Sequence, residues 1–268
     1  MLTQAVRQPG TTLSYLPAYI LNIDLRFMSV LYTYLTAYII IKLSYNNCKI
    51  IFNKKFLLVY IITALFLLFP YRHLRSDLYE PFYWFLLSLS LYLLNKGKLF
   101  AFSIVWSVGI FTQVWNWIFS PFITLYLYKK CGFKKAMLYT FVYLSLGIIS
   151  LSIFILPDIN NYYKHVFGFY RDLINKKHYA ETSIYITPLI HFLGLTQVLL
   201  HIQLFFSAII GIISIFKLKT FRHLLIFLSF IFFTFIQFNS LTWNYMYINL
   251  LILLIIFFSL YEIDQSNK

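Results

Sequence analysis

Charged side chains are scarce in this chain, and acidic side chains are the scarcest. Only 11% of the 268 residues are charged, and only 8 residues are Asp or Glu. A water-soluble chain of this size needs more charge to cover its surface, and its 61% apolar residues would leave large apolar patches in water. We therefore expect an integral membrane protein with a lipid bilayer as its surroundings.

Cysteine and the common catalytic motifs are also nearly absent. The two cysteines, Cys48 and Cys131, lie in separate polar segments, which excludes a disulfide-stapled scaffold. The chain has no HExxH, no CxxC and no glycine-rich phosphate loop. The sequence therefore indicates no metal site and no certain cofactor. Whether the protein depends on a divalent metal stays open.

The apolar residues are grouped in runs that predict an all-α, polytopic membrane protein with about nine membrane helices. The pair 99–112 and 116–128 has the form of a short hairpin broken around Gln113–Asn116. No repeat or linker divides the chain, so we expect one membrane domain over residues 1–268. The predicted segments are 27–44, 56–70, 81–95, 99–112, 116–128, 136–156, 196–216, 223–238 and 243–261.

The basic residues alternate between the polar segments and orient the chain. Of the 22 Lys and Arg residues, 14 lie in the segments 42–55, 95–98, 129–135 and 217–222 and at the C-terminus. The positive-inside rule makes these segments cytoplasmic, together with the C-terminus. The net charge of +14 is thereby spread over short turns, which excludes a nucleic-acid-binding face.

The same rule places the loops 71–80 and 157–182 on the outer face, either of the plasma membrane or in the lumen of the endoplasmic reticulum. Nine spans with a cytoplasmic C-terminus leave the N-terminus outside. We expect either a translocated N-terminus or a missing first span before Met1. Residues 158–181 have the aromatic spacing of a helix that lies in the outer interface.

The outer loop 71–80 gathers charges that suit lipid-phosphate chemistry. Arg72, His73 and Arg75 can bind a phosphate. Asp77 beside them can accept a proton from an acceptor hydroxyl. The alternative is a solvated loop whose charges only end two helices.

A second set of polar and aromatic residues suits a sugar site. Gln113, Trp115 and Asn116 lie at the break of the predicted hairpin, and Trp243 and Asn244 lie near the last outer loop. Indole faces stack on sugar rings, and amides bind hydroxyl groups. An ordinary aromatic belt explains the Trp residues equally well, but it does not explain the amides.

Several short motifs resemble the polytopic GT-C glycosyltransferases, most closely family 87 and related mannosyltransferase-like proteins. Tyr15-Leu16-Pro17 before a span is similar to the segment that follows the family's first outer loop. Ser76-Asp77-Leu78 and the helix that follows resemble its outer turn and helix, and residues 99–130 resemble its helical hairpin. Trp243-Asn244-Tyr245 also fits the entry to the family's last span.

The resemblance implies transfer of a mannose-like hexose from a polyprenyl-phosphate donor to an acceptor on the outer or lumenal face. The family's catalytic Asp lies in its first outer loop, before the start of this chain, so the resemblance leaves an inactive or incomplete form open. Asp77 is the first remaining candidate and Asp24 the second. Gln113 stands where the family has a basic residue. The alternative class is a non-enzymatic membrane protein, either a transporter or flippase for lipid-linked sugars or a scaffold subunit.

Overall fold

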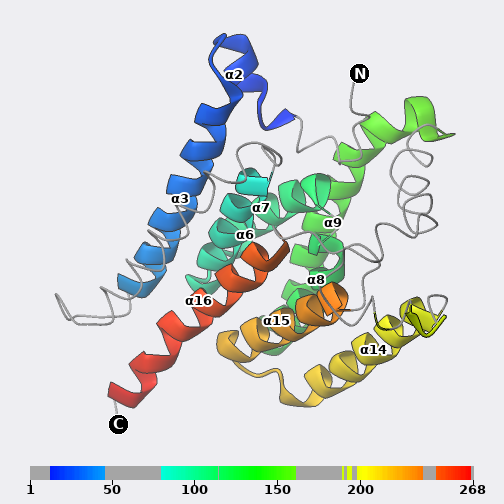
Figure 1. Cartoon of the computed structure of the whole chain (residues 1–268). Helices are drawn as coiled ribbons and strands as arrows, with labels where there is room; N and C mark the ends of the chain where they lie inside the picture. Colours follow the sequence, from blue (N-terminus) through cyan, green and yellow to red (C-terminus); the bar gives the residue numbers. More distant parts are fainter. Residues whose placement is uncertain are drawn as a thin grey trace.

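The fold of this chain is known from a computed structural model that describes residues 13–45, 80–113, 115–160, 189, 192–194, 198–237 and 246–266. Within these ranges the chain forms helices and turns and no strand (Figure 1). The predicted all-α class is therefore confirmed for the described residues. The helices are α2 (Leu16–Ile20), α3 (Leu25–Tyr45), α6 (Glu80–Asn95), α7 (Leu99–Thr112), α8 (Trp115–Cys131), α9 (Phe133–Ile155), α14 (Leu199–Lys217), α15 (Phe221–Gln237) and α16 (Met246–Ser266), with a 3-10 turn, η1 (Leu156–Asp158), after α9.

Eight of the nine predicted segments coincide with helices, and the ninth, 56–70, lies outside the described residues. The main differences are at the polar ends. Helix α8 continues to Cys131 and α9 begins at Phe133, so both extend into the basic segment between them. Lysine is a good helix former, which lets the helices run beyond the apolar residues that predicted them.

One described helix, α9, is long and apolar enough to cross a bilayer. Only 22% of its apolar stretch is buried inside the protein. The other apolar helices, or parts of helices, are shorter, at 10–17 residues: Leu99–Thr112, His201–Lys217, Phe221–Gln237 and Ile248–Phe258.

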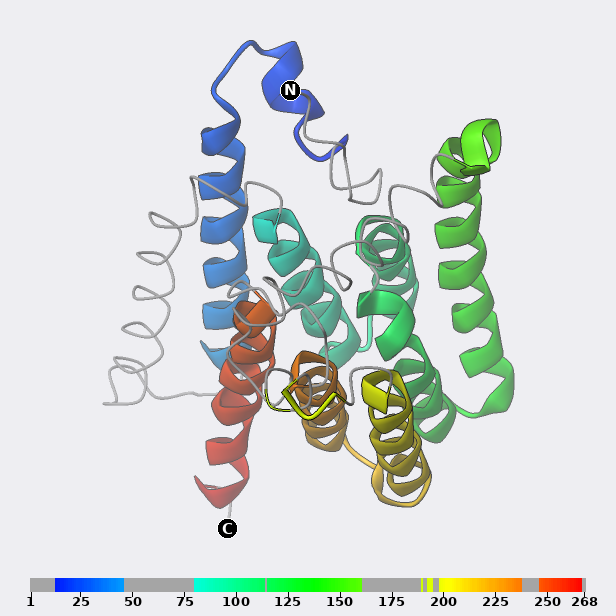
Figure 2. The same ribbon diagram turned by 45° about the vertical axis from the view of Figure 1, so that its right-hand side comes forward.

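The helices meet in tight turns at two ends of the bundle. The basic end contains the turn at 96–98, the turn at Gly132 and the turn at 218–220 (Figures 1 and 2). The opposite end contains the start of α6, the break between α7 and α8, and η1. Gly97 and Gly132 have positive φ angles of 73° and 80°, which glycine adopts without steric cost. At Gly97 the amide of Lys98 also bonds the Leu93 carbonyl at 2.9 Å, as in a Schellman motif.

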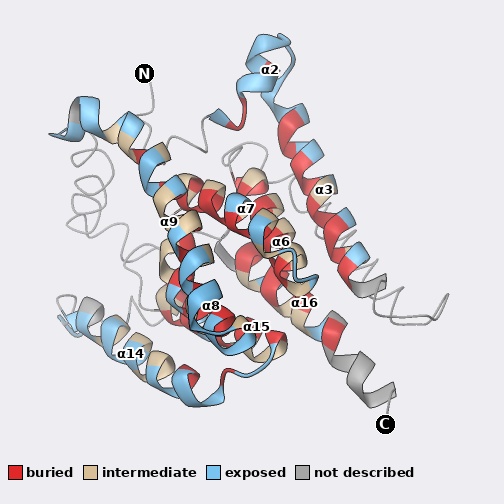
Figure 3. Cartoon of the chain, turned by 180° about the vertical axis from the view of Figure 1, so that it is seen from behind, coloured by how far each residue is buried: buried red, intermediate tan, exposed pale blue. Residues whose placement is uncertain are grey.

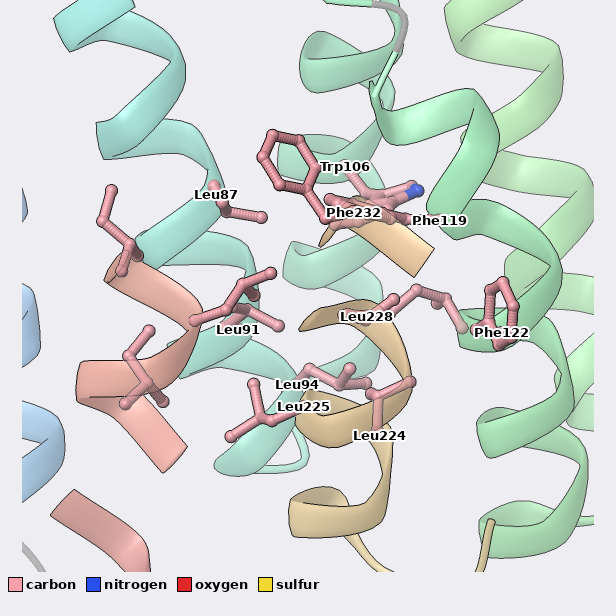
Figure 4. Close-up of a cluster of buried hydrophobic side chains, with 14 of the residues drawn as sticks. Leu87, Leu91, Leu94, Trp106, Phe119, Phe122, Leu224, Leu225, Leu228 and Phe232 are labelled. Atoms are coloured by element: carbon pink, nitrogen blue, oxygen red, sulfur yellow. The ribbon is translucent and has the colours of Figure 1, made fainter. Parts of the chain in front are cut away.

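The centre of the bundle is apolar and closely packed. Helix α7 packs between α6 and α9, while α15 packs against α16 and α8. The side chains that fill the space between α6, α7, α8 and α15 are Leu87, Leu91, Leu94, Trp106, Phe119, Phe122, Leu224, Leu225, Leu228 and Phe232 (Figure 4). Gly147 allows α9 to approach α7, because a Cβ there would lie 2.7 Å from Cγ2 of Ile110.

The outside of the bundle is apolar as well. Exposed residues cover much of α9 and α14 and one side of α3 (Figure 3). Many of them are large hydrophobic side chains, including Phe141 and Ile149 on α9 and Phe205 and Phe216 on α14. Contiguous apolar surface of this kind is typical of a face that contacts lipid or another protein.

Candidate functional site

At the end opposite the basic turns, polar side chains gather around the break between α7 and α8. Helix α7 ends at Thr112, Gln113 is extended with φ −147° and ψ 142°, and α8 begins at Trp115. The predicted break around Gln113–Asn116 is therefore confirmed. Because helix ends expose unbonded backbone groups, such a break is stable in an apolar bundle only where polar side chains surround it.

The first polar pair at the break is Glu80 with Gln113. Glu80 is the first residue of α6 and is only 3% exposed. The side-chain amide Nε2 of Gln113 donates a hydrogen bond to Oε1 of Glu80 at 3.1 Å. The helix dipole at the start of α6 also favours a negative charge at this position. The chain therefore holds a carboxyl group inside the protein, bonded to the residue that interrupts the hairpin.

The second polar pair lies one turn further along α6. The Tyr83 hydroxyl donates to Oδ1 of Asn116 at 2.9 Å, and Nδ2 of Asn116 donates to the Trp106 carbonyl at 3.2 Å. Asn116 is 1% exposed. Gly109 makes room for it, since a Cβ at Gly109 would lie 2.0 Å from Nδ2 of Asn116. These contacts tie α6, α7 and α8 together at the break.

Hydroxyl groups continue the polar contacts into the bundle. Ser120 donates to the Asn116 carbonyl at 2.5 Å and accepts a hydrogen bond from Nε1 of Trp106 at 3.1 Å. Pro121 follows inside α8 and has no N–H, so the helix bond to the Trp117 carbonyl is missing next to Ser120. The Tyr143 hydroxyl of α9 donates to the Ser120 carbonyl at 3.3 Å. The polar network thus spans four helices.

Asp24, the second catalytic candidate, directly precedes α3. It is exposed, and its Oδ1 accepts a hydrogen bond from the Arg26 amide at 2.9 Å. Its Oδ2 accepts from Nε of Arg26 at 2.8 Å and also from Nη2. These hydrogen bonds from Arg26 lower the pKa of Asp24 to about 2. A carboxylate with so low a pKa is a weak general base.

Of the remaining predicted site residues, only Trp115 lies within the described part of the chain. The Trp115 ring lies against α15, with its centroid 4.3 Å from Phe232 and 6.1 Å from Phe235. The other predicted site residues lie outside the described residues, and their roles stay predictions. They are Arg72, His73, Arg75, Asp77, Trp243 and Asn244. Most of the loops 71–80 and 157–182 lies outside as well.

The structure adds two features to the candidate residues named from the sequence. Glu80 is the last charged residue of the loop 71–80 in the sequence, and the structure shows that it is buried. Its position before Pro81, at a predicted membrane boundary, is the sequence signal for that burial. An open groove of about 260 Å³ also lies between Trp117 of α8 and the end of α9, and its lining is almost entirely apolar.

Among the described residues no group of three His, Cys, Asp or Glu side chains is placed to bind a metal.

Comparison with protein-family models, with curated proteins and with solved structures found no match for this chain. The described residues define an all-helical bundle in which a buried carboxyl group, Glu80, is bonded to the amide of the half-buried Gln113 at one end. The functional assignment therefore rests on the chemistry of that end.

Proposed function

We propose that this chain is a multi-pass membrane glycosyltransferase that acts on the outer or lumenal face, with its C-terminus in the cytoplasm. The observation that carries the proposal is Glu80, a carboxyl group buried at the opposite end and bonded to Gln113. A buried carboxyl group is costly, and such groups cluster where proteins do chemistry.

The distribution of charge supports the membrane orientation. Lysines gather in the turns of the basic end, whereas Asp24 and Glu80 belong to the opposite end. The exposed apolar faces of α9 and α14 suit contact with lipid chains. On the proposed topology, the break between α7 and α8 faces the side on which polyprenyl-phosphate sugars are used.

The proposed reaction is transfer of a mannose-like hexose from a polyprenyl phosphate to an acceptor hydroxyl. The hydroxyl oxygen bonds to the anomeric carbon, the bond from that carbon to the lipid phosphate breaks, and a carboxylate takes the hydroxyl proton. Asp77 and Glu80 are the two candidates for this base, and Asp24 follows them because of its low pKa. Arg72, His73 and Arg75 would stabilise the leaving phosphate.

The sugar-contacting residues are proposed at the same end. Gln113 is half-buried and lies beside Glu80, so it can fix the carboxyl group or reach a hydroxyl. Trp115, Asn116, Trp243 and Asn244 complete the set expected from the sequence. Asn116 acts within the network, because both ends of its amide are bonded to protein.

The test is transfer of labelled hexose from a polyprenyl-phosphate donor by membranes that contain the chain. We expect Asp77→Asn or Glu80→Gln to lower the rate by about 100-fold or more, the usual contribution of a general base. Glu262→Gln, on the cytoplasmic part of α16 in the proposed topology, is the matched control and should retain the rate. Equal rates for the wild type and both outer variants would refute the proposal.

A second candidate, a non-enzymatic scaffold subunit or a transporter for lipid-linked sugars, is favoured by one observation. The amide of Asn116 is hydrogen-bonded to protein at both its oxygen and its nitrogen, as expected for a structural network. The two candidates differ in donor turnover. A scaffold or transporter would bind or move the lipid-linked sugar without releasing polyprenyl phosphate.

A further inference from the structure

We propose that the α6–α7 and α8–α9 turns form a docking surface for the headgroup of an anionic phospholipid in the inner leaflet. The inference rests on the membrane orientation proposed above, but it does not depend on transferase activity. Six lysines lie in these two turns and the helix ends beside them: Lys96, Lys98, Lys129, Lys130, Lys134 and Lys135.

The two turns lie next to each other at the basic end. Nζ of Lys130, at the end of α8, donates to the Leu94 carbonyl at the end of α6 at 3.4 Å. Near the starts of α7 and α9, the Ser103 hydroxyl donates to the Tyr139 carbonyl at 3.4 Å. Both helices therefore begin at the same end and close together.

Some Lys and Arg side chains of the basic end form contacts within the protein. Lys129 bonds the Ile215 carbonyl of α14, and Arg222 bonds the Leu260 carbonyl of α16. Nζ of Lys130 also lies 5.4 Å from the centroid of the Tyr126 ring. Lys129 thereby caps the carbonyl end of α14, and Arg222 ties α15 to α16, so these contacts account for part of the basic charge.

The four lysines of the docking surface other than Lys129 and Lys130 form no contacts of this kind. Lys96, Lys98, Lys134 and Lys135 are exposed, and within the described part of the chain their side chains form no hydrogen bond or ion pair. Four like charges on two neighbouring turns, with no ion pair of their own in the described part of the chain, repel one another. An anionic ligand would relieve that repulsion.

The surroundings of these lysines favour a lipid over a soluble anion. Phe100 and Phe133 are exposed next to the lysines, and Tyr128 lies in edge contact with Phe133, their ring centroids 6.4 Å apart. Further along α9, Met137 and Phe141 continue the exposed apolar surface. A phosphate bound by the lysines would thus have its acyl chains beside an apolar helix face.

The test measures retention of phosphatidylglycerol and of phosphatidylcholine by the full chain in detergent, using native mass spectrometry. We expect the wild type to retain phosphatidylglycerol preferentially. Each lysine near an anionic surface contributes about fivefold to binding, so Lys98→Gln with Lys134→Gln should weaken retention by at least about tenfold. Replacing the same two residues by Arg should preserve retention.

The matched control is Lys217→Gln with Lys219→Gln, which removes two exposed lysines from the α14–α15 region of the same end. This control should retain the lipid. Equal loss in both pairs would show a diffuse effect of net charge and overturn the proposal. Retention of phosphatidylcholine equal to that of phosphatidylglycerol would also overturn the proposal. So would displacement of phosphatidylglycerol by inorganic phosphate at the concentration of the lipid.

Discussion

Asn116 and Asn249 are both buried asparagines, but their surroundings differ. Asn116 is 1% exposed and bonded to Tyr83 and to the Trp106 carbonyl. Asn249 of α16 is 0% exposed, and neither its Oδ1 nor its Nδ2 has a hydrogen-bond partner within the described residues. A buried amide stabilises a protein only when its hydrogen bonds are formed.

The same substitution should therefore destabilise the protein at Asn116 but not at Asn249. Asn116→Leu leaves the buried Tyr83 hydroxyl without its acceptor, removes the side-chain bond to the Trp106 carbonyl, and should lower the free energy of unfolding by about 1–3 kcal/mol. Asn249→Leu removes an unbonded amide and should leave stability unchanged or raise it. Thermal unfolding in detergent measures both. Destabilisation by Asn249→Leu that matches that of Asn116→Leu would contradict the described hydrogen bonding.

The pKa of Asp24 gives another prediction for a single residue. Hydrogen bonds from Arg26 lower this pKa from 3.8 to about 2. Since the folded-state pKa lies below the ordinary value, the stabilisation is complete above pH 3.8 and is lost as the pH falls through about 2. A carbon-13 titration of the Asp24 carboxyl group should show a midpoint near 2, and Arg26→Gln should move it towards 3.8. A midpoint of 3.8 in the wild type would exclude the Arg26 contact in solution.

At the scale of helices, the sequence predicted the elements well because apolar runs and basic turns are local signals. Eight predicted segments are helices, and the break after Thr112 was expected from Gln113 and Asn116. The pairing of Glu80 with Gln113 was not predicted, because it joins residues 33 positions apart and depends on how α6 packs against α7. The hydrogen bond between Tyr83 and Asn116 was not predicted either, because it also joins residues that are 33 positions apart.

The contact between α7 and α8 depends on glycine at position 109. Gly109→Ala would bring a Cβ to 2.0 Å from Nδ2 of Asn116, and overpacking of this kind costs about 1–3 kcal/mol. Gly211→Ala, in the middle of α14, is the matched control, because a Cβ there meets nothing within 4 Å. It should leave stability unchanged or raise it by up to about 1 kcal/mol, the helix-propensity difference. Similar unfolding temperatures for the two variants would contradict the packing at the break.

At the scale of the whole molecule, charge and apolar surface agree on the proposed orientation. The basic turns gather at one end, the buried carboxyl group lies at the other, and exposed apolar side chains cover the helices between them. The orientation itself stays a prediction from the sequence, which can be made because the positive-inside rule counts residues and needs no tertiary contacts. The sequence could not predict which helices lie at the edge of the bundle, as α14 does, because that depends on packing between distant segments (Figure 1).

The orientation can be tested with a native cysteine. Cys131 lies at the basic end and is partly exposed. With Cys48→Ser to remove the other thiol, we expect Cys131 to react with a membrane-impermeant maleimide only after the cells are permeabilised. Labelling of Cys131 in intact cells would reverse the proposed topology.

The most direct test of the central claim is hexose transfer in sealed vesicles of known orientation. An impermeant acceptor is supplied outside, and the polyprenyl-phosphate donor is incorporated in the membrane. We predict transfer in right-side-out vesicles, no transfer in sealed inside-out vesicles, and loss of the right-side-out rate in Glu80→Gln. Transfer confined to inside-out vesicles, or none in either orientation with a functional donor and acceptor, would contradict an outer-face glycosyltransferase.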